Sequence, residues 1–207
     1  MPYLRKMNFL AHAYLSFGHP DLLTGNMMAD SIQGLQKTAF PEALQKGIAL
    51  HHAIDTFTDN HPVTQEAKLH FRPDTGKYAG VFMDVVYDHF LANDPDRFPP
   101  QQLKAFTQHT YAVLQQHDSD LPERFKKVLY HMKKEDWLWS YRQRSGIQKA
   151  FAGIYHRATF LPSSDAAFGV FNQQYASFQR AYTLFMPALE EHAKRIYLRM
   201  LHQPLQS

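Results

Sequence analysis

The chain has 207 residues, and 44% of them are hydrophobic, which is enough for one substantial core. Cysteine is absent, so disulfides and thiolate metal sites are excluded, and any bound metal must take nitrogen and oxygen ligands. The formal net charge of +3 is too small to indicate a nucleic-acid-binding protein, and no stretch approaches the roughly 20 apolar residues that span a bilayer. We therefore expect a cytoplasmic protein that binds no nucleic acid and does not insert into membranes.

The first half of the chain shows helical periodicity interrupted by proline and glycine clusters. Gly18 and Pro20 are expected to end a first helix, and Asp21 is a suitable N-cap for the second. Pro41 suits the first turn of a third helix. We expect helices over residues 8–16, 21–33, 41–58 and 76–92, with a short helix between turns at 61–62 and 73–76.

The second half continues this pattern after a proline-rich loop at residues 93–100. Helices are expected over residues 101–116, 122–131, 135–143 and 147–156. A last helix starts at Asp165, carries an aromatic packing seam that begins at Phe171, and is predicted to kink at Pro187. Because the sequence shows little strand alternation and neither internal repeats nor low-complexity linkers, it predicts one all-α domain, a helical bundle, over residues 1–207.

One stripe of the third predicted helix changes from apolar to polar along its length. Leu44, Ile48, His51, Asp55 and Asp59 recur at steps of four, three, four and four, which places them on one face. Burying an imidazole or a carboxylate without a partner is costly, so something must compensate. A metal ion is the simplest candidate, because His51 and Asp55 are four residues apart and can bind one ion from the same face.

The helix predicted over residues 76–92 carries a second polar group. Asp84 and Asp88 are four residues apart and lie at the border of the apolar arc, where two carboxylates repel unless a cation or a proton intervenes. His89 points into that apolar arc. A solvated helix face is the alternative interpretation, and the apolar neighbours on both sides make it the weaker one.

Two earlier segments add further polar residues to apolar helices. Asn26 and Asp30 are four residues apart in GNMMAD, and His12 lies inside FLAHAYL. Taken alone, a histidine such as His12 is more often a hydrogen-bonded core residue than a ligand. His52 points about a quarter turn away from His51, so we expect it to be exposed or hydrogen-bonded. Four helices with inward polar groups together favour a shared site.

Such a set of Asp and His residues suits hard or borderline ions such as Mn²⁺, Mg²⁺ or Fe²⁺. The chemistry that fits it is hydrolysis of a phosphate ester, because a metal lowers the pKa of water and offsets charge on phosphoryl oxygens. A neighbouring Asp or His can accept the proton. The sequence contains no GxSxG motif and no Walker motif, which argues against serine-hydrolase and P-loop chemistry.

Several motifs together resemble those of the acyl carrier protein phosphodiesterase family. These are MNFLAH (7–12), GNMMAD (25–30), GIALHHAID with TDNHP (47–62) and DVVYDHFL (84–91). The similarity continues through DWLWSY (136–141), GI (146–147) and the Tyr/Phe-rich C-terminal helix. It therefore covers nearly the whole chain from Met7 onward. Residues 1–6 precede the usual start of the family, as a native N-terminal extension or through an alternative start site.

The resemblance implies a fold, an activity and a partner. Members are divergent, all-helical relatives of HD-type phosphohydrolases that use Mn²⁺ or a similar ion. They hydrolyse the phosphodiester that joins 4′-phosphopantetheine to a serine of holo-acyl carrier protein, a carrier of fatty acid biosynthesis. The products are apo-acyl carrier protein and 4′-phosphopantetheine. The mildly basic balance of the chain fits an acidic carrier protein as substrate.

The resemblance implies a site centred on Asp30, His51, Asp55, Asp84, Asp88 and His89, with Asn26, His12 and Asp59 nearby. The role of each residue is our hypothesis. The metal or its surrounding hydrogen bonds are expected to be held by Asp30, His51, Asp55 and Asp88. Catalytic assistance is expected from Asp84, His89 and Asp59. Substrate contacts are expected from Asn26 and His12, and basic side chains that meet the partner from Arg72, Lys77 and Arg157. His52 stands where the family is expected to have an arginine.

Two alternatives remain open from the sequence. The first is an HD-like phosphohydrolase that acts on nucleotides or other small phosphodiesters. The second is a helical binding protein without enzymatic activity, whose His and Asp residues form structural hydrogen bonds.

Overall fold

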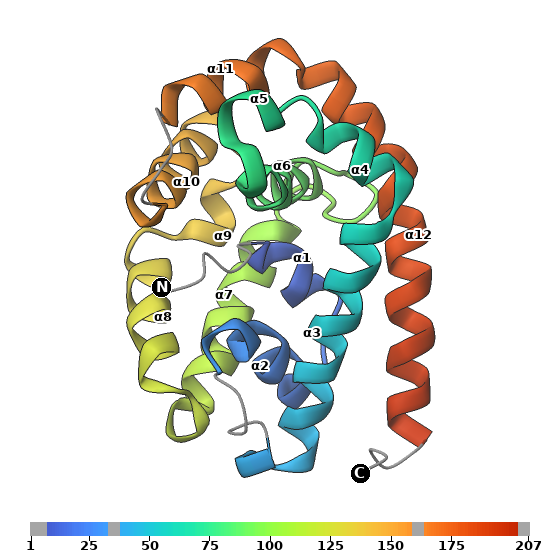
Figure 1. Ribbon diagram of the computed structural model, residues 1–207. Helices are drawn as coiled ribbons and strands as arrows, with labels where there is room; N and C mark the ends of the chain where they lie inside the picture. The colour runs from blue at the N-terminus through green and yellow to red at the C-terminus, as the bar shows by residue number, and fades with distance from the viewer. Residues whose placement is uncertain (1–7, 33–37, 159–163, 203–207) are drawn as a thin grey trace.

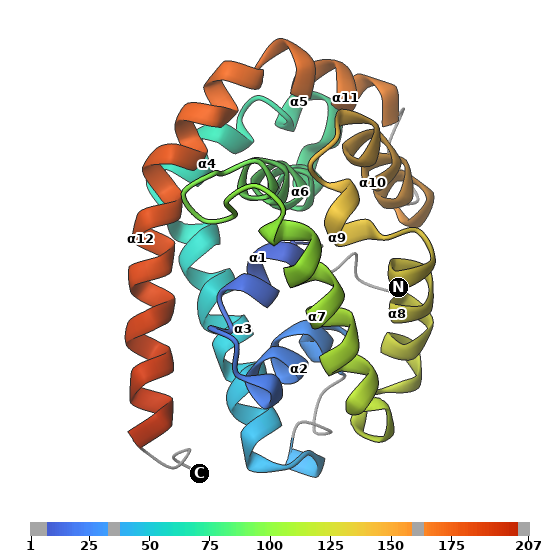
Figure 2. The same cartoon turned by 180° about the vertical axis from the view of Figure 1, so that it is seen from behind.

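The structure is a computed structural model that describes residues 8–32, 38–158 and 164–202. These residues form helices joined by turns, and no strand occurs among them, which confirms the predicted all-α fold class. Figures 1 and 2 show one helix, α6, in the middle of the molecule, with the other helices around it. One cluster of buried apolar side chains runs from Leu10 in the first helix to Ala193 in the last.

The N-terminal part contains α1 (Phe9–Tyr14), α2 (Pro20–Met28), the 3-10 turn η1 (Ala29–Ser31) and α3 (Glu42–Asn60). Pro20 begins α2 and does not merely end the preceding helix, because its fixed φ suits the first helical turn. The N-cap is His19, whose ring accepts a hydrogen bond from the Leu22 amide, and not Asp21 as predicted. α2 tightens into η1 from Ala29, so its α-helical part is shorter than the predicted segment.

The next part contains α4 (Pro62–Lys68), α5 (Arg72–Thr75), the 3-10 turn η3 (Gly76–Tyr78) and α6 (Ala79–Ala92). The predicted helix over residues 76–92 is therefore α-helical only from Ala79. Gly76 has φ +54°, a left-handed conformation that glycine adopts without strain and that ends α5. Every residue of α6 except Gly80 is buried, so its polar side chains lie inside the protein and not at a solvated border.

The remaining helices are α7 (Gln102–Gln116), η4 (Asp118–Asp120), α8 (Glu123–Lys134), α9 (Trp137–Ser140), α10 (Arg144–Arg157), α11 (Ser164–Gln173) and α12 (Tyr175–His202). The segment predicted as a helix over 135–143 is α-helical only in the four residues of α9, because Asp136 before it takes a left-handed conformation with φ 49°. The predicted last helix is divided into α11 and α12, and α12 continues through Pro187.

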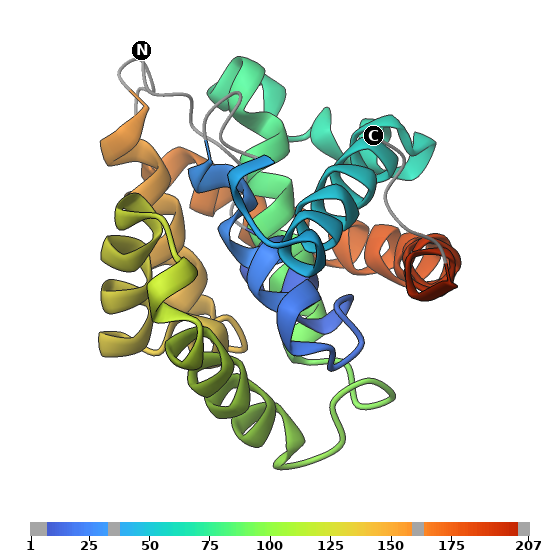
Figure 3. The ribbon, with the colours of Figure 1, turned by 90° about the horizontal axis from the view of Figure 1, so that it is seen from below.

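The helices pack around aromatic contacts that hold α6 in place. The rings of Phe71 and Phe178 stack with centroids 5.0 Å apart, and those of Phe82 and Phe151 meet edge to face at 4.8 Å. Figure 3 shows α12 nearly end-on at one side, next to α3, with α7 and α8 at the other side. Within the described part of the chain, no helix is both long enough and apolar enough to cross a membrane.

Candidate active site

Four side chains from the N-terminal helices meet in one cluster. The Nε2 atoms of His12 and His51 each lie 3.3 Å from a carboxylate oxygen of Asp55, and His51 Nε2 lies 3.4 Å from Asp30 Oδ1. The two imidazole rings stack with centroids 4.1 Å apart. α1 supplies His12, η1 supplies Asp30, and α3 supplies the i, i+4 pair of His51 and Asp55 that the stripe predicted.

Two glycines bring α2 and α3 close enough to build this cluster. A Cβ added to Gly47 would lie 2.5 Å from Leu22 O and 2.8 Å from the Cα of Gly25, which is closer than real Cβ contacts come. The backbones of the two helices therefore touch, because neither glycine has a side chain that would separate them. This crossing brings Asp30, which follows α2, to His51 on α3. No pattern in the sequence alone predicts this role for the two glycines.

Asn26 fixes the orientation and the tautomer of His12. Its Nδ2 donates to His12 O at 2.9 Å and to Ser16 Oγ at 3.1 Å, so its Oδ1 accepts from the Nδ1–H of His12 at 2.6 Å. The lone pair of the neutral ring then lies on Nε2, which faces Asp55. Hydrogen bonds of this type orient histidine ligands in metal sites. Asn26 is fully buried, so it supports His12 from behind. A contact with the substrate was predicted for Asn26, but its amide is not accessible to one.

The ring nitrogens that face the carboxylates suit a bound cation. Among the described residues, no hydrogen bond satisfies Nε2 of His12 or of His51, although both are buried. Ligand atoms about 2.0–2.2 Å from one ion lie about 3.0–3.4 Å from each other, which matches the 3.3 Å nitrogen–oxygen distances here. Ligand atoms of His12, His51 and Asp55 all lie within 4.8 Å of one another, so the residues fit a divalent metal.

The electrostatics of the cluster lead to the same conclusion. Burial lowers the pKa of His51, but its electrostatic interactions with the carboxylates of Asp30 and Asp55 outweigh burial and raise the pKa to about 9. Burial and the neighbouring His51 lower the pKa of His12. Burial opposes ionisation of Asp55, but both histidines hold its pKa well below its usual range. The carboxylates therefore stabilise positive charge between them, and the ring of His12 is the more readily neutral of the two imidazoles.

The cluster has an opening to solvent on its carboxylate side. The side chains of His12 and His51 are 2% and 4% exposed, whereas those of Asp55 and Asp30 are 17% and 23% exposed. A substrate can therefore approach along the carboxylates but not along the imidazole rings. His52 is exposed and lines a separate hollow between α3 and α12, as its quarter-turn offset from His51 predicts.

The polar residues of α6 do not join the cluster in the way that was predicted for them. Asp88 was predicted as a metal ligand, but its two oxygens accept the amide hydrogens of Leu10 at 3.0 Å and Ala11 at 2.9 Å. It thus satisfies amide groups in the first turn of α1 and fixes the helix that carries His12. Asp84 is 1% exposed and lies one turn earlier on α6, and the two carboxylates repel, which together with burial raises the pKa of Asp88.

His89 faces away from α1 and toward the C-terminal helices. Its Nδ1 lies 2.7 Å from Tyr141 O, and its Nε2 lies 2.9 Å from the hydroxyl of Tyr175. Both ring nitrogens are therefore engaged, one by the residue that follows α9 and the other by α12. The predicted role of His89 in proton transfer gives way to a structural one, because neither nitrogen is directed at the cluster.

Three other predicted residues meet in a small polar pocket beside the cluster. Asp59, Arg72 and Lys77 line a cavity of about 320 Å³ between α3, α4, α5 and the start of α6. Asp59 accepts a 2.8 Å hydrogen bond from the buried Lys68. The pocket begins one helical turn beyond Asp55 and is rich in cationic groups. The side chain of Arg157, the remaining predicted substrate contact, lies outside the described part of the structure.

The fold and the cluster define a class: an all-α protein with a histidine–carboxylate centre suited to a hydrolytic divalent metal. The family model described as acyl carrier protein phosphodiesterase matches residues 7–189. Relatives named acyl carrier protein phosphodiesterase from Enterobacter sp. strain 638 and from Escherichia coli O6:H1 are each 32% identical, and one from Yersinia pestis is 30% identical. Each match spans 91% of this chain and 98% of the relative. No solved structure matches significantly.

The chain therefore belongs to the acyl carrier protein phosphodiesterase family. The family and the enzyme class predicted from the motifs, a phosphodiester hydrolase, are confirmed. This membership decides against a non-enzymatic binding protein, and it favours a carrier protein over nucleotides as the substrate.

Proposed function

We propose that the chain hydrolyses the phosphodiester between 4′-phosphopantetheine and a serine of holo-acyl carrier protein, releasing apo-carrier protein and 4′-phosphopantetheine. The observation that supports this most strongly is the stacked, buried pair of His12 and His51 against the partly exposed carboxylates of Asp30 and Asp55. It is the one described group of residues that combines a preorganised metal-binding set with access for a substrate.

His12, His51 and Asp55 would hold the ion, and Asp30 would complete or flank this set. The mixed nitrogen and oxygen donors favour Mn²⁺ or Fe²⁺ over Mg²⁺, which prefers oxygen ligands, and we propose Mn²⁺. When bound, the ion supplies Lewis-acid chemistry that lowers the pKa of water and offsets negative charge on the phosphoryl group. Asn26 keeps His12 in the tautomer that a ligand requires.

The chain's own residues also position the substrate and the proton. Asp30 is the more exposed carboxylate of the cluster and is placed to accept a proton from water at its mouth. The cationic pocket of Arg72 and Lys77 lies one turn beyond Asp55 and would hold anionic groups of the substrate. Asp59 keeps Lys68 oriented in that pocket.

A substitution of Asp55 tests the proposal. Asp55→Ala should abolish conversion of holo- to apo-carrier protein, followed by mass spectrometry as the loss of the phosphopantetheine mass, and should lower the Mn²⁺ content of the purified protein. Asp96→Ala removes an exposed carboxylate from the 93–100 loop and serves as the matched control. Full activity with full metal content in Asp55→Ala would remove this cluster from the mechanism.

A further inference from the structure

A groove of about 630 Å³ lies between α8, α9 and α10, and none of the cluster residues lines it. Small and apolar side chains contribute to its wall, among them Val128, Trp137 and Ala150. Gly146, Ala150 and Gly153 follow one another at steps of four and three on α10, so this helix presents little side-chain bulk to the groove. The remaining lining includes two lysines, two histidines and one acidic residue: Lys127, Lys149, His131, His156 and Glu135.

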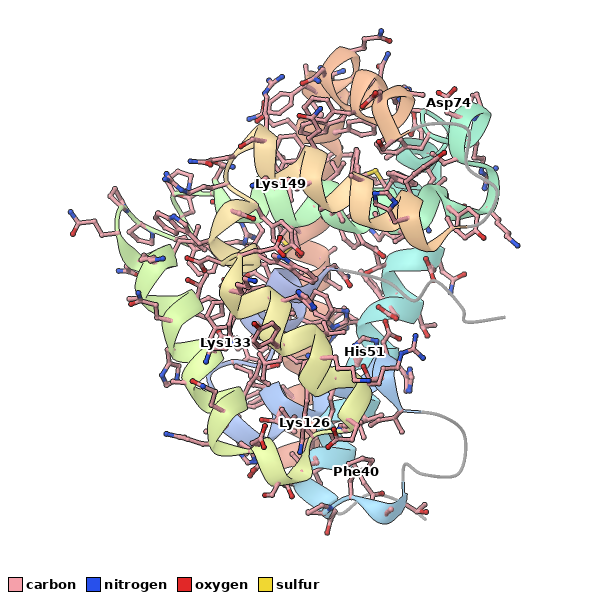
Figure 4. The ribbon with its side chains drawn as sticks, turned by 90° about the vertical axis from the view of Figure 1, so that its left-hand side faces the viewer. Phe40, His51, Asp74, Lys126, Lys133 and Lys149 are labelled. Carbon is pink, nitrogen blue, oxygen red and sulfur yellow. The ribbon has the colours of Figure 1, made fainter. Side chains whose placement is uncertain are left out.

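The segment that forms this groove carries the positive charge of the whole chain. Residues 121–157 contain nine Lys or Arg and three Asp or Glu, a net charge of +6, whereas the complete chain has only +3. The rest of the protein is therefore slightly acidic. Figure 4 looks onto this face, with Lys126 and Lys133 of α8 and Lys149 of α10 turned toward the viewer.

The lysines of the groove are available to a partner. Lys127 and Lys149 are exposed, and within residues 8–32, 38–158 and 164–202 neither forms an ion pair. Lys126, by contrast, is paired with Asp118 and Glu123 on the protein's own surface. Unpaired cations around an apolar wall are complementary to a protein surface with the reverse pattern, acidic groups around apolar side chains.

The groove lies close to α1, the helix that carries His12 of the cluster. The ring of Trp137, in the groove wall, lies 6.5 Å from that of Phe9. Phe9 begins α1, and His12 follows one helical turn later, a rise of about 4.5 Å. A partner seated in the groove would therefore hold a flexible phosphate-linked group close to the cluster.

We propose that the α8–α10 groove is the docking surface for the acidic carrier protein, and this inference rests on the proposed function above. The carrier places acidic side chains against Lys127 and Lys149 and apolar side chains against Trp137 and Ala150. The phosphate-linked arm then reaches the cluster from its open side, along the carboxylates of Asp30 and Asp55. Recognition of the protein and hydrolysis of the diester thus use separate surfaces.

Charge reversal tests the docking surface. The double variant Lys127→Glu/Lys149→Glu should raise KM for holo-carrier protein about tenfold, with kcat nearly unchanged and a weaker dependence of KM on salt, because two attractive contacts become repulsive. Its affinity for apo-carrier protein, measured by calorimetry without any turnover, should fall by a similar factor. Hydrolysis of bis(p-nitrophenyl) phosphate with Mn²⁺ should be unaffected, because that compound does not need the groove.

A second charge reversal provides the matched control. Lys194→Glu/Arg195→Glu makes the same change in charge on exposed residues of α12, on the opposite side of the molecule from α8, and should leave KM unchanged. Equal KM and equal affinity in the wild type and the groove variant would overturn the docking site, as would a groove variant that changes only the self-association of the chain. Failure of the wild type to convert holo-carrier protein, despite binding of the apo form at the groove, would refute the proposed function and leave the docking site standing.

Discussion

Gly47→Ala is the sharpest test of how the cluster is assembled. Alanine in a helix interior is normally about 1 kcal/mol more favourable than glycine, so helix propensity alone predicts a more stable protein. The added Cβ, however, would meet backbone atoms of α2 at 2.5–2.9 Å, whereas ordinary contact begins at 3.4 Å. Because backbone cannot rotate away as a side chain can, α2 and α3 must separate by about 1 Å.

Overpacking of this kind costs about 1–3 kcal/mol, which offsets or exceeds the gain in helix propensity. We expect the free energy of unfolding in urea to fall by up to about 2 kcal/mol. In the wild type, His51 Nε2 and Asp30 Oδ1 lie 3.4 Å apart, and the separation of the helices moves them further apart. The Mn²⁺ concentration for half-maximal conversion of holo-carrier protein should therefore rise at least tenfold.

Gly169→Ala is the matched control, because Gly169 lies inside α11 and, apart from its own helix, no atom of the described residues lies within 4 Å of its added Cβ. This variant should be equally or more stable than the wild type, by up to about 1 kcal/mol, and should need no additional Mn²⁺. If Gly47→Ala behaves as Gly169→Ala does in both measurements, the close crossing of α2 and α3 is refuted as the feature that builds the cluster.

Three further predictions concern side chains around the cluster. Asp88→Ala leaves the amide hydrogens of α1 without their acceptor and should lower the free energy of unfolding in urea by about 1–3 kcal/mol, with weaker Mn²⁺ binding because α1 carries His12. Unchanged stability would contradict the capping role. Asn26→Ala should weaken Mn²⁺ binding about 10–100-fold in a metal titration, because the tautomer of His12 is no longer fixed. Burial lowers the pKa of His89 from 6.5, so the unfolded state binds the proton more readily and the stability contributed by the neutral ring is lost as the pH falls below 6.5. In denaturant unfolding between pH 5 and 7.5, the free energy of unfolding should therefore fall less toward low pH in His89→Gln than in the wild type. The same dependence of this free energy on pH in both proteins would contradict the assignment.

Much of the fold and part of the site followed from local pattern. Helical periodicity placed most of the long helices, because apolar spacing reports the face that a helix buries. It also paired His51 with Asp55, since residues four apart on one helix face are neighbours in any helix. The predicted helix boundaries were wrong at Pro20, at Asp136 and at Gln174, which separates α11 from α12. At such positions the backbone conformation of one or two residues decides where a helix begins or ends.

The sequence by itself determined the all-α class, the family motifs and the pair of His51 and Asp55. Only the tertiary structure decided which other polar residues meet that pair. Asp84 and Asp88 have the same i, i+4 spacing as His51 and Asp55, yet Asp88 caps α1. The physical reason is that spacing fixes neighbours within one helix, whereas partners on other helices depend on crossing geometry, here set by the contact of Gly25 with Gly47.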